Sequence, residues 1–260
     1  MHYRILLEAL TPLAFRSGRN PTQSNTLTYV PGTNLIGGLA QVHQMLGRSE
    51  EEFIRFFLED RIFYGNCYSA RFGDQADELR GQNDPVLPMP LTARSCKRFP
   101  GFAFRAEQQR EYRTGVTDLL IPLALFALSG EQRGDLLDPW QDCTCQFPQD
   151  DPQKHPLDRI PGFFRRGQEA SHYGQPKIQQ SLRTHTGINY DTGIVQSAIL
   201  YSRKRLEGGL SFWGSWFVED TLQHDFEAFV AQVHQSNLLR VGTGRTRGYG
   251  RISFNHASLP

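Results

Sequence analysis

Nine residues near the C-terminus, Gly242–Gly250, combine four glycines with two arginines and one tyrosine, and they include no acidic residue. Glycine lets the backbone adopt positive φ and lets another molecule approach the main chain closely. Arginine offers phosphate a fixed fork of donors, and a tyrosine ring offers a face on which a base can stack. Arg240 and Arg251 flank the run. This composition favours a loop that binds a polyanion; the alternative is a flexible glycine-rich hairpin with solvated arginines.

The residues around this run exclude two familiar nucleotide-binding loops. The Walker loop ends in Gly-Lys-Ser/Thr and opens a helix, and neither feature is found here. The dinucleotide fingerprint opens a helix early in a β-α-β unit, whereas only ten residues follow Gly250. Those residues begin with the strand-like alternation of Ile252 and Phe254, and 238–241 also reads as a short strand. The loop is therefore predicted to join two strands.

The overall composition is that of a globular protein. Hydrophobic residues make up 38% and aromatic residues 12% of the 260 residues, which argues against disorder. No apolar stretch approaches the ~20 residues of a membrane span, and the N-terminus reads as a strand rather than a signal peptide. We therefore expect a cytoplasmic protein with no membrane partner. The net charge of only +1 predicts a short nucleic-acid site, because proteins that hold long nucleic acid alone are usually more basic.

Hydrophobic periodicity predicts alternating strands and helices in both halves of the chain. Alternation predicts strands at 2–10 and 210–218, and helical spacing with capping residues predicts helices that begin near Thr33, Ser49 and Asp225. The stretches 85–90 and 138–161 are rich in Pro, Asp and Gln and read as loops. The result is an expected α+β fold with an N-terminal domain at 1–135, a linker or insertion at 136–170 and a C-terminal domain at 171–260.

The four cysteines leave a metal site open. A cytoplasmic chain would keep them reduced. Cys143 and Cys145 lie in a polar, proline-rich stretch with His155 ten residues further on, and zinc could use two or three cysteines with a histidine. Their CxC spacing departs from the commoner CxxC. We expect no required cofactor, with a structural zinc at Cys143, Cys145 and Cys96 as the alternative.

Several segments, taken in order, resemble the RAMP superfamily, the repeat-associated proteins of CRISPR systems. The run Gly242–Gly250 fits the family's glycine-rich loop, and 30–40 is similar to its Pro-Gly helix start, with Ile36-Gly37 where the family has a basic residue. Residues 187–201 and 206–212 are similar to a Thr-Gly motif of type III effector subunits. The stretches 63–70 and 87–97 resemble the type III-D subunit of the Csx group.

This resemblance implies two ferredoxin-like (RRM-like) domains, with the glycine-rich loop between terminal strands. It also implies a non-catalytic subunit of a type III-D CRISPR RNA-guided antiviral complex with a Cas5-like role. Such a subunit binds the 5′ tag of the guide RNA and caps the backbone of the complex. Its partners would be the guide RNA, the other effector subunits and, indirectly, the target RNA. The family's middle region often carries a CxxC-like zinc motif, from which Cys143-Thr-Cys145 departs.

Three segments supply candidate RNA-binding residues. Single-stranded RNA is held by backbone amides, by cations on phosphates and by aromatic rings under bases. The glycine-rich loop supplies Gly242, Gly244, Arg245, Arg247, Gly248, Tyr249 and Gly250. The loop after the first strand supplies Arg16, Ser17 and Arg19, and the Thr-Gly region supplies Arg183, His185 and Asn189. For the last six, a solvated surface role is the alternative.

A metal-independent endoribonuclease that processes guide RNA is the alternative function. Such enzymes share the fold and cut RNA by attack of the 2′-hydroxyl, often with a histidine as general acid or base. His43 lies in the first predicted helix, with Tyr29 and Arg48 nearby in sequence. His43 falls beside the apolar face of that helix, however, which predicts a surface or boundary position instead.

Overall fold

The computed structural model describes residues 1–17, 23–70, 86–102, 115–130, 132, 135, 137, 155–166, 173–176, 178–188 and 195–259. It separates into two compact units. The first unit combines Met1–Gly73 with Ile178–Pro260, and the second is Asp74–Lys177. The two ends of the chain thus belong to one unit, and the middle of the chain forms the other.

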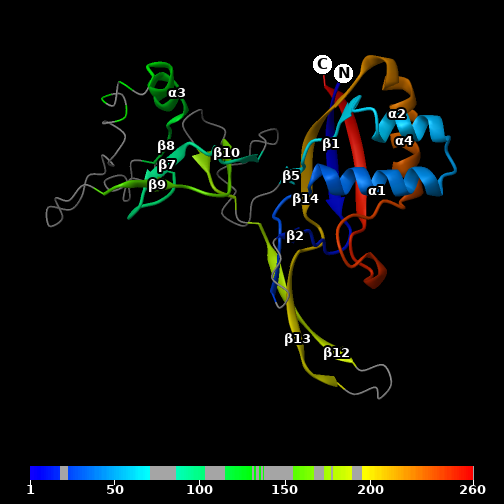
Figure 1. Cartoon of the computed structure of the whole chain (residues 1–260). Coiled ribbons are helices and arrows are strands. Elements are labelled where there is room, and N and C mark those ends of the chain that lie inside the picture. Colours follow the sequence, from blue (N-terminus) through cyan, green and yellow to red (C-terminus); the bar gives the residue numbers. More distant parts are fainter. Residues whose placement is uncertain are drawn as a thin grey trace. The chain divides into compact units, whose positions relative to one another are not determined.

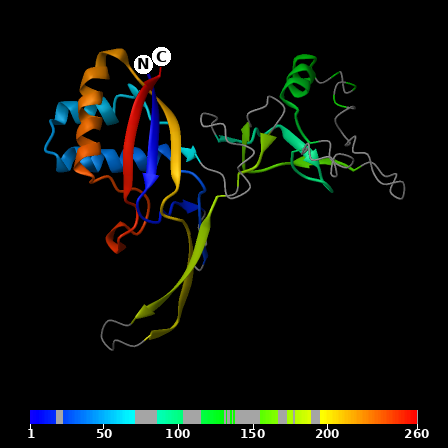
Figure 2. The same ribbon diagram turned by 180° about the vertical axis from the view of Figure 1, so that it is seen from behind.

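An antiparallel sheet joins both ends of the chain in the first unit (Figure 1). Its order is β15–β1–β14–β4, and β5 also pairs with β14. These strands span Ile252–Leu259, His2–Ala9, Ser211–Val218, Ile62–Phe63 and Tyr68–Ser69, respectively. The central strand β1 places Leu7 opposite Phe212 of β14 on one side and Phe254 of β15 on the other. Helices α1 (Gly32–Met45), α2 (Glu50–Phe57) and α4 (Gln223–Ser236) lie on one side of this sheet (Figures 1 and 2).

The chain order of these elements is β1, then α1 and α2, then β4 and β5, then β14, α4 and β15. This is the β-α-β-β-α-β order of ferredoxin-like folds. The described residues contain this order once, because residues 178–260 complete the sheet begun by residues 1–73. The observed units therefore differ from the predicted division into domains at 1–135 and 171–260 with a linker at 136–170. Sheet pairing between strands 200 residues apart leaves no local signal in the sequence.

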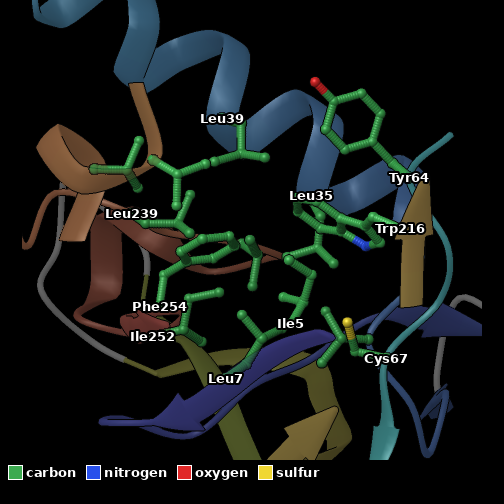
Figure 3. Packing of buried hydrophobic residues seen from close by; sticks show 14 of the residues in the cluster. Ile5, Leu7, Leu35, Leu39, Tyr64, Cys67, Trp216, Leu239, Ile252 and Phe254 are labelled. Atoms are coloured by element: carbon green, nitrogen blue, oxygen red, sulfur yellow. The ribbon is translucent and has the colours of Figure 1, made fainter. Parts of the chain in front are cut away.

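The core of the first unit lies between the sheet and the helices. Alternation along β1 buries Tyr3, Ile5, Leu7 and Ala9, as the sequence predicts. Figure 3 shows Ile5 and Leu7 from the sheet packed with Leu35 and Leu39 of α1, with Trp216 and Phe254 beside them. The predicted helix at 225–235 is α4, and its Phe226, Phe229, Val230 and Val233 are all buried. The sheet–helix sandwich follows directly from these two periodicities.

Helix α1 begins two residues earlier than its predicted N-cap implies. Its N-cap is Pro31, not Thr33, and no side chain caps it. Instead, the Gly32 amide donates to Asn66 Oδ1 at 2.9 Å. A Cβ on Gly32 would lie 2.1 Å from the Tyr64 carbonyl oxygen, so the Pro-Gly start serves close packing of the helix end. The predicted cap of α2 is confirmed, since Ser49 Oγ accepts from the Glu52 amide at 3.3 Å.

A second sheet of the first unit has the order β12–β13–β3–β2. Its strands are Gln180–Ile188, Val195–Leu206, Gln23–Thr26 and Arg16–Ser17, respectively. The β12–β13 hairpin extends away from the main sheet (Figure 2). It is anchored at its base, where Leu206 is buried in the core and its amide donates to the Leu13 carbonyl at 2.8 Å. The hairpin therefore leaves the core as a projecting arm.

The second unit holds two small three-stranded sheets, β8–β7–β9 and β11–β10–β6. Their strands are Val116–Asp118, Ala93–Cys96 and Leu157–Arg159, then Tyr173–Gly174, Phe163–Arg166 and Leu87–Pro88, respectively. Helix α3 (Leu120–Leu128) follows β8. Met89, Ala93 and Ile160 form a small core. Of the helices described in either unit, none has the length and apolar character needed to cross a membrane.

Candidate nucleic-acid interface

The glycine-rich loop Gly242–Gly250 lies between α4 and β15. The expected strand at 238–241 is a single bridge, in which Arg240 pairs with Arg251. All four glycines of the loop have positive φ, between 78° and 87°. At Gly242 a Cβ would lie 2.5 Å from the Ala14 carbonyl oxygen, and at Gly250 it would lie 2.3 Å from the Val241 carbonyl oxygen. These two glycines are therefore required for the loop to dock against its own protein.

Main-chain hydrogen bonds hold the loop on residues 12–14. The Thr243 amide donates to the Ala14 carbonyl at 2.8 Å, and the Gly250 amide donates to the Pro12 carbonyl at 3.1 Å. Gly248 differs from the docking glycines, because a Cβ there would meet nothing within 4 Å. Gly248 is exposed, so it is the point at which another molecule can reach the loop's main chain.

The two loop arginines reach different elements. Residues Arg245–Arg247 form one 3-10 turn, and both arginines are exposed. Arg245 Nη1 donates to Gln41 Oε1 of α1 at 2.5 Å. Arg247 Nη1 donates to the hydroxyl of Tyr201 on β13 at 3.0 Å. The loop thus links the first helix to the projecting hairpin.

One face of the hairpin gathers cations and aromatic rings. Because side chains alternate along a strand, Tyr201, Arg203 and Arg205 share a face of β13. The register places His185 opposite Tyr201 and Arg183 opposite Arg203. The His185 and Tyr201 rings stack with centroids 5.2 Å apart, and the Arg203 guanidinium lies 5.0 Å from the Tyr201 ring centroid.

Arg205 joins this hairpin face to the glycine-rich loop. Its side chain is 3% exposed, and its guanidinium lies 4.0 Å from the centroid of the Tyr249 ring. The same guanidinium donates to His185 Nε2. One face of Tyr249 is therefore covered by Arg205, so a base can stack only on the other. We call the set Arg183, Arg203, Arg205 and Arg247, with His185, Tyr201 and Tyr249, the arginine face.

Positive charge on the arginine face is not neutralised within the described part of the chain, where no carboxylate forms an ion pair with any of its four arginines. Burial and the neighbouring guanidiniums lower the pKa of His185. The hydrogen bond from Arg247 is the main cause that lowers the pKa of Tyr201. Arg183 and Arg203 lie directly opposite each other, and like charges in that position destabilise a sheet. A bound anion would weaken the repulsion between Arg183 and Arg203 and would raise the lowered pKa of His185.

The remaining candidates stand apart from this face. Arg16 and Ser17 form β2 of the same four-stranded sheet, where Arg16 pairs with Thr26 and is exposed. Strand β3 separates them from β13. Arg19 and Asn189 lie outside the described residues. The structure therefore unites the glycine-rich loop with Arg183 and His185, and it leaves Arg16 and Ser17 at the opposite edge of the sheet.

Three residues of the arginine face are absent from the sequence-based predictions: Tyr201, Arg203 and Arg205. A signal for them exists in the sequence. In the segment Tyr-Ser-Arg-Lys-Arg at 201–205, a period of two places the aromatic ring and two arginines on one side of a strand. The segment 202–205 lies between the two stretches, 187–201 and 206–212, that carry the Thr-Gly resemblance.

His43 is a core residue, which corrects the expected surface or boundary position. It is 1% exposed, and the rings of Phe53, Phe57 and Phe229 lie at 5.4–5.7 Å from it. Its Nε2 lies 3.2 Å from Glu52 Oε1, and burial lowers its pKa. Helices α2 and α4 cover the side of α1 that carries His43, which the sequence of α1 alone does not reveal. His43 cannot contact an RNA phosphate in this conformation.

Of the three candidate metal ligands, Cys96 is among the residues that the structure describes. Cys96 is fully buried, with Phe99 and Leu157 packed against it. Cys143 and Cys145 lie outside the described residues. In the part of the chain that the structure describes, no three His, Cys, Asp or Glu side chains are grouped so that they could hold a metal ion. The zinc site therefore stays a prediction.

No protein-family model and no curated protein matches this chain. Among solved structures, it is similar to a chain of type III-B Cmr-beta in the apo state, with 11% identity over 99% of this chain and 98% of that chain, and a TM-score of 0.47. It is also similar to Cmr4 from Pyrococcus furiosus, with 10% identity, 99% coverage of both chains and a TM-score of 0.41. A chain of a type IV-B CRISPR complex has 12% identity over 100% of this chain and 94% of that chain, with a TM-score of 0.36. Likenesses at this level assign neither a fold nor a function to this chain.

Proposed function

We propose that this protein is a non-catalytic subunit of a CRISPR RNA-guided complex, of type III-D, that binds the 5′ tag of the guide RNA and caps the backbone of the complex. The arginine face and the glycine-rich loop beside it are the observation that carries this proposal. None of the four guanidiniums has a carboxylate partner among the described residues, and those of Arg183, Arg203 and Arg247 are exposed or half-exposed. The motif resemblance to RAMP proteins supports the particular complex and the Cas5-like role.

The chemistry of the site favours a short single-stranded RNA. Arginines and the exposed main chain at Gly248 suit closely spaced phosphates, while the free side of Tyr249 suits an unstacked base. A net charge of +1 over the whole chain suits a few phosphates rather than a long duplex. The remaining guide RNA, and the target RNA paired with it, would then be held by the other effector subunits.

The same geometry favours binding over cleavage. His185 is the histidine of the arginine face, but its Nε2 accepts from Arg205, which leaves that nitrogen engaged. Its lowered pKa keeps the imidazole neutral near pH 7, so it is a poor general acid. His43 lies in the core, away from any RNA. These contacts support a structural role for both histidines, in place of the proton transfer that the endoribonuclease alternative requires.

RNA binding by purified variants tests this proposal. The probe is a single-stranded RNA with the repeat-derived 5′ tag, and the variants are Arg247→Gln and the control Arg159→Gln, an exposed arginine of the second unit. We expect Arg247→Gln to weaken binding about tenfold and to lower the salt dependence by about 0.7, the value of one phosphate on a single strand. Equal affinities for the two variants would contradict the proposal. Site-specific cleavage of the RNA would establish the endoribonuclease instead.

A further inference from the structure

Arg205 is the buried member of the arginine face. It is 3% exposed, whereas Arg183 and Arg247 are exposed and Arg203 is half-buried. An RNA phosphate that approaches this face from solvent therefore meets the other three arginines and does not reach the guanidinium of Arg205. The role of Arg205 must differ from direct binding of phosphate.

The buried charge of Arg205 is not compensated by an acid in the described part of the chain, where no carboxylate forms an ion pair with it. The residue opposite it on β12 is Ser181. Taking a guanidinium out of water is unfavourable unless other contacts replace the lost water. An apolar side chain of similar length would fill the same space without that cost, so packing alone does not explain an arginine at this position.

Two contacts fix the guanidinium of Arg205. It lies 4.0 Å from the centroid of the Tyr249 ring, and it donates a hydrogen bond to Nε2 of His185. A guanidinium is planar, so it can donate in its plane while its flat side lies against an aromatic ring. The hydrogen bond to the hairpin therefore sets the orientation of the guanidinium, and the guanidinium in turn covers one face of Tyr249 in the glycine-rich loop.

Gly244 restricts the same ring from another side. A Cβ on Gly244 would lie 2.8 Å from Cδ2 of Tyr249 and 3.7 Å from both Cγ and Cε2. These distances place the Cβ beyond the ring edge, because an atom above Cδ2 would lie closer to its two neighbours. The edge of Tyr249 is thus against the main chain, and one face is against Arg205. Tyr249 is half-buried, and among the described residues no ring contacts its other face.

Building on the proposed RNA-binding function, we propose that Arg205 is a positioning residue that holds Tyr249 as a platform on which one unpaired base of the RNA stacks. The stacked order is guanidinium, tyrosine ring and base. A ring that is already held in place loses little conformational freedom when the base binds, and aromatic side chains hold the bases of single-stranded RNA in this way. The site then holds one base beside the phosphates.

Fluorescent RNAs locate the stacked base. The base analogue 2-aminopurine, whose fluorescence falls when it stacks, replaces each base of the single-stranded tag in turn. We expect one position to be quenched by the unmodified chain but not by Tyr249→Leu. RNA binding with no position whose quenching depends on Tyr249 would overturn this proposal and leave the RNA-binding function standing. Absence of RNA binding by the unmodified chain would overturn both.

An RNA that lacks the base at the quenched position tests the role of Arg205. We expect loss of this base to weaken binding to the unmodified chain about tenfold. The same loss should weaken binding to Arg205→Met or Arg205→Lys at most about threefold, because Tyr249 is no longer held. Methionine keeps the apolar length of the side chain, and lysine keeps the charge without the flat guanidinium.

Arg203→Met is the matched control, since it removes a charge of the same face that lies over Tyr201 and not over Tyr249. Both RNAs should bind this variant more weakly, and the tenfold factor between them should persist. Because the factor compares two RNAs on the same variant, a loss of folded protein lowers both affinities equally and leaves the factor unchanged. A tenfold factor in the Arg205 variants, or its equal loss in Arg203→Met, would overturn the proposal.

Discussion

Replacing Arg203 with methionine separates a functional cation from a structural one. Arg203 lies opposite Arg183 in the β12–β13 hairpin, and its guanidinium lies 5.0 Å from the Tyr201 ring centroid. Methionine keeps an unbranched apolar side chain over Tyr201 but removes the charge. If Arg203 stabilises the fold, this change lowers the free energy of unfolding. If Arg203 binds an anion, the change lowers RNA affinity instead.

The expected effect on stability is small. Removing one member of a like-charged pair across two strands should add about 0.2–1 kcal/mol to the free energy of unfolding. Loss of the cation–π contact with Tyr201 should subtract about 0.5–1 kcal/mol. The two contributions nearly cancel, so Arg203→Met should unfold within about 1 kcal/mol of the unmodified protein.

The expected effect on RNA binding is larger. A hydrogen bond between an arginine and a phosphate contributes about 1.5–3 kcal/mol, so the affinity should fall at least about tenfold. The slope of log K against log salt should become shallower by about 0.7 for the one phosphate lost. Fluorescence anisotropy with tag RNA between 50 and 200 mM salt, together with urea denaturation, measures these quantities, with Arg159→Met as the control.

The reverse pattern would show that Arg203 does not bind an anion. If Arg203→Met lowers the free energy of unfolding by more than about 2 kcal/mol and leaves both the affinity and the salt slope unchanged, Arg203 serves the fold. The cations of the hairpin would then owe their positions to packing, and the arginine face would not be an anion site.

Three further predictions concern glycines and histidines. Gly250→Ala should lower the free energy of unfolding by more than about 2 kcal/mol, because φ is 87° and a Cβ would lie 2.3 Å from the Val241 carbonyl oxygen. Gly248→Ala should cost only the ~1–2 kcal/mol of a left-handed alanine. Similar losses for the two variants in urea denaturation would count against the docking role of Gly250. Because the pKa of His43 is lowered in the folded protein, the unfolded chain binds more protons, and the contribution of His43 to stability is complete above pH ~6.5 and is lost as the pH falls below that value. His43→Ala should lower the free energy of unfolding by about 2–4 kcal/mol, flatten this acid dependence and leave RNA affinity unchanged. A change in RNA affinity alone would contradict the core role of His43. RNA phosphates should raise the lowered pKa of His185. RNA affinity should therefore increase as the pH is lowered from 8 to 5.5, and it should increase less in His185→Asn than in the unmodified protein. Equal pH profiles of the two proteins would argue against RNA at this face.

Local periodicity was sufficient to predict the main elements. Alternation identifies the buried side of β1, and helical spacing identifies the buried side of α4, where Phe226 to Val233 are all in the core. The cap of α2 at Ser49 is also readable from a few neighbouring residues. Each of these features depends on residues within one or two turns of each other. Such features can be predicted from the sequence because they do not depend on which strand or helix packs beside them.

Features that depend on distant contacts were not predictable in the same way. The pairing of β1 with β14 and β15 moves the C-terminal residues into the unit begun at the N-terminus, so the predicted domain boundaries do not coincide with the observed units. His43 has helical neighbours typical of a boundary residue, and only the packing of α2 and α4 against α1 buries it. That no residue of α3 is buried is equally hidden, because its apolar sequence is typical of a core helix.

The sequence by itself determined that the Gly242–Gly250 loop is rich in glycine and arginine, free of acid and placed before a terminal strand. Composition and alternation are local properties, so they are readable without a fold. Only the tertiary structure decided which glycines dock the loop on its own protein, and which arginines of a distant hairpin stand beside Arg247 and Tyr249. The reason is physical: charges act through space, and the distances between them are set by strand register and packing over the whole chain.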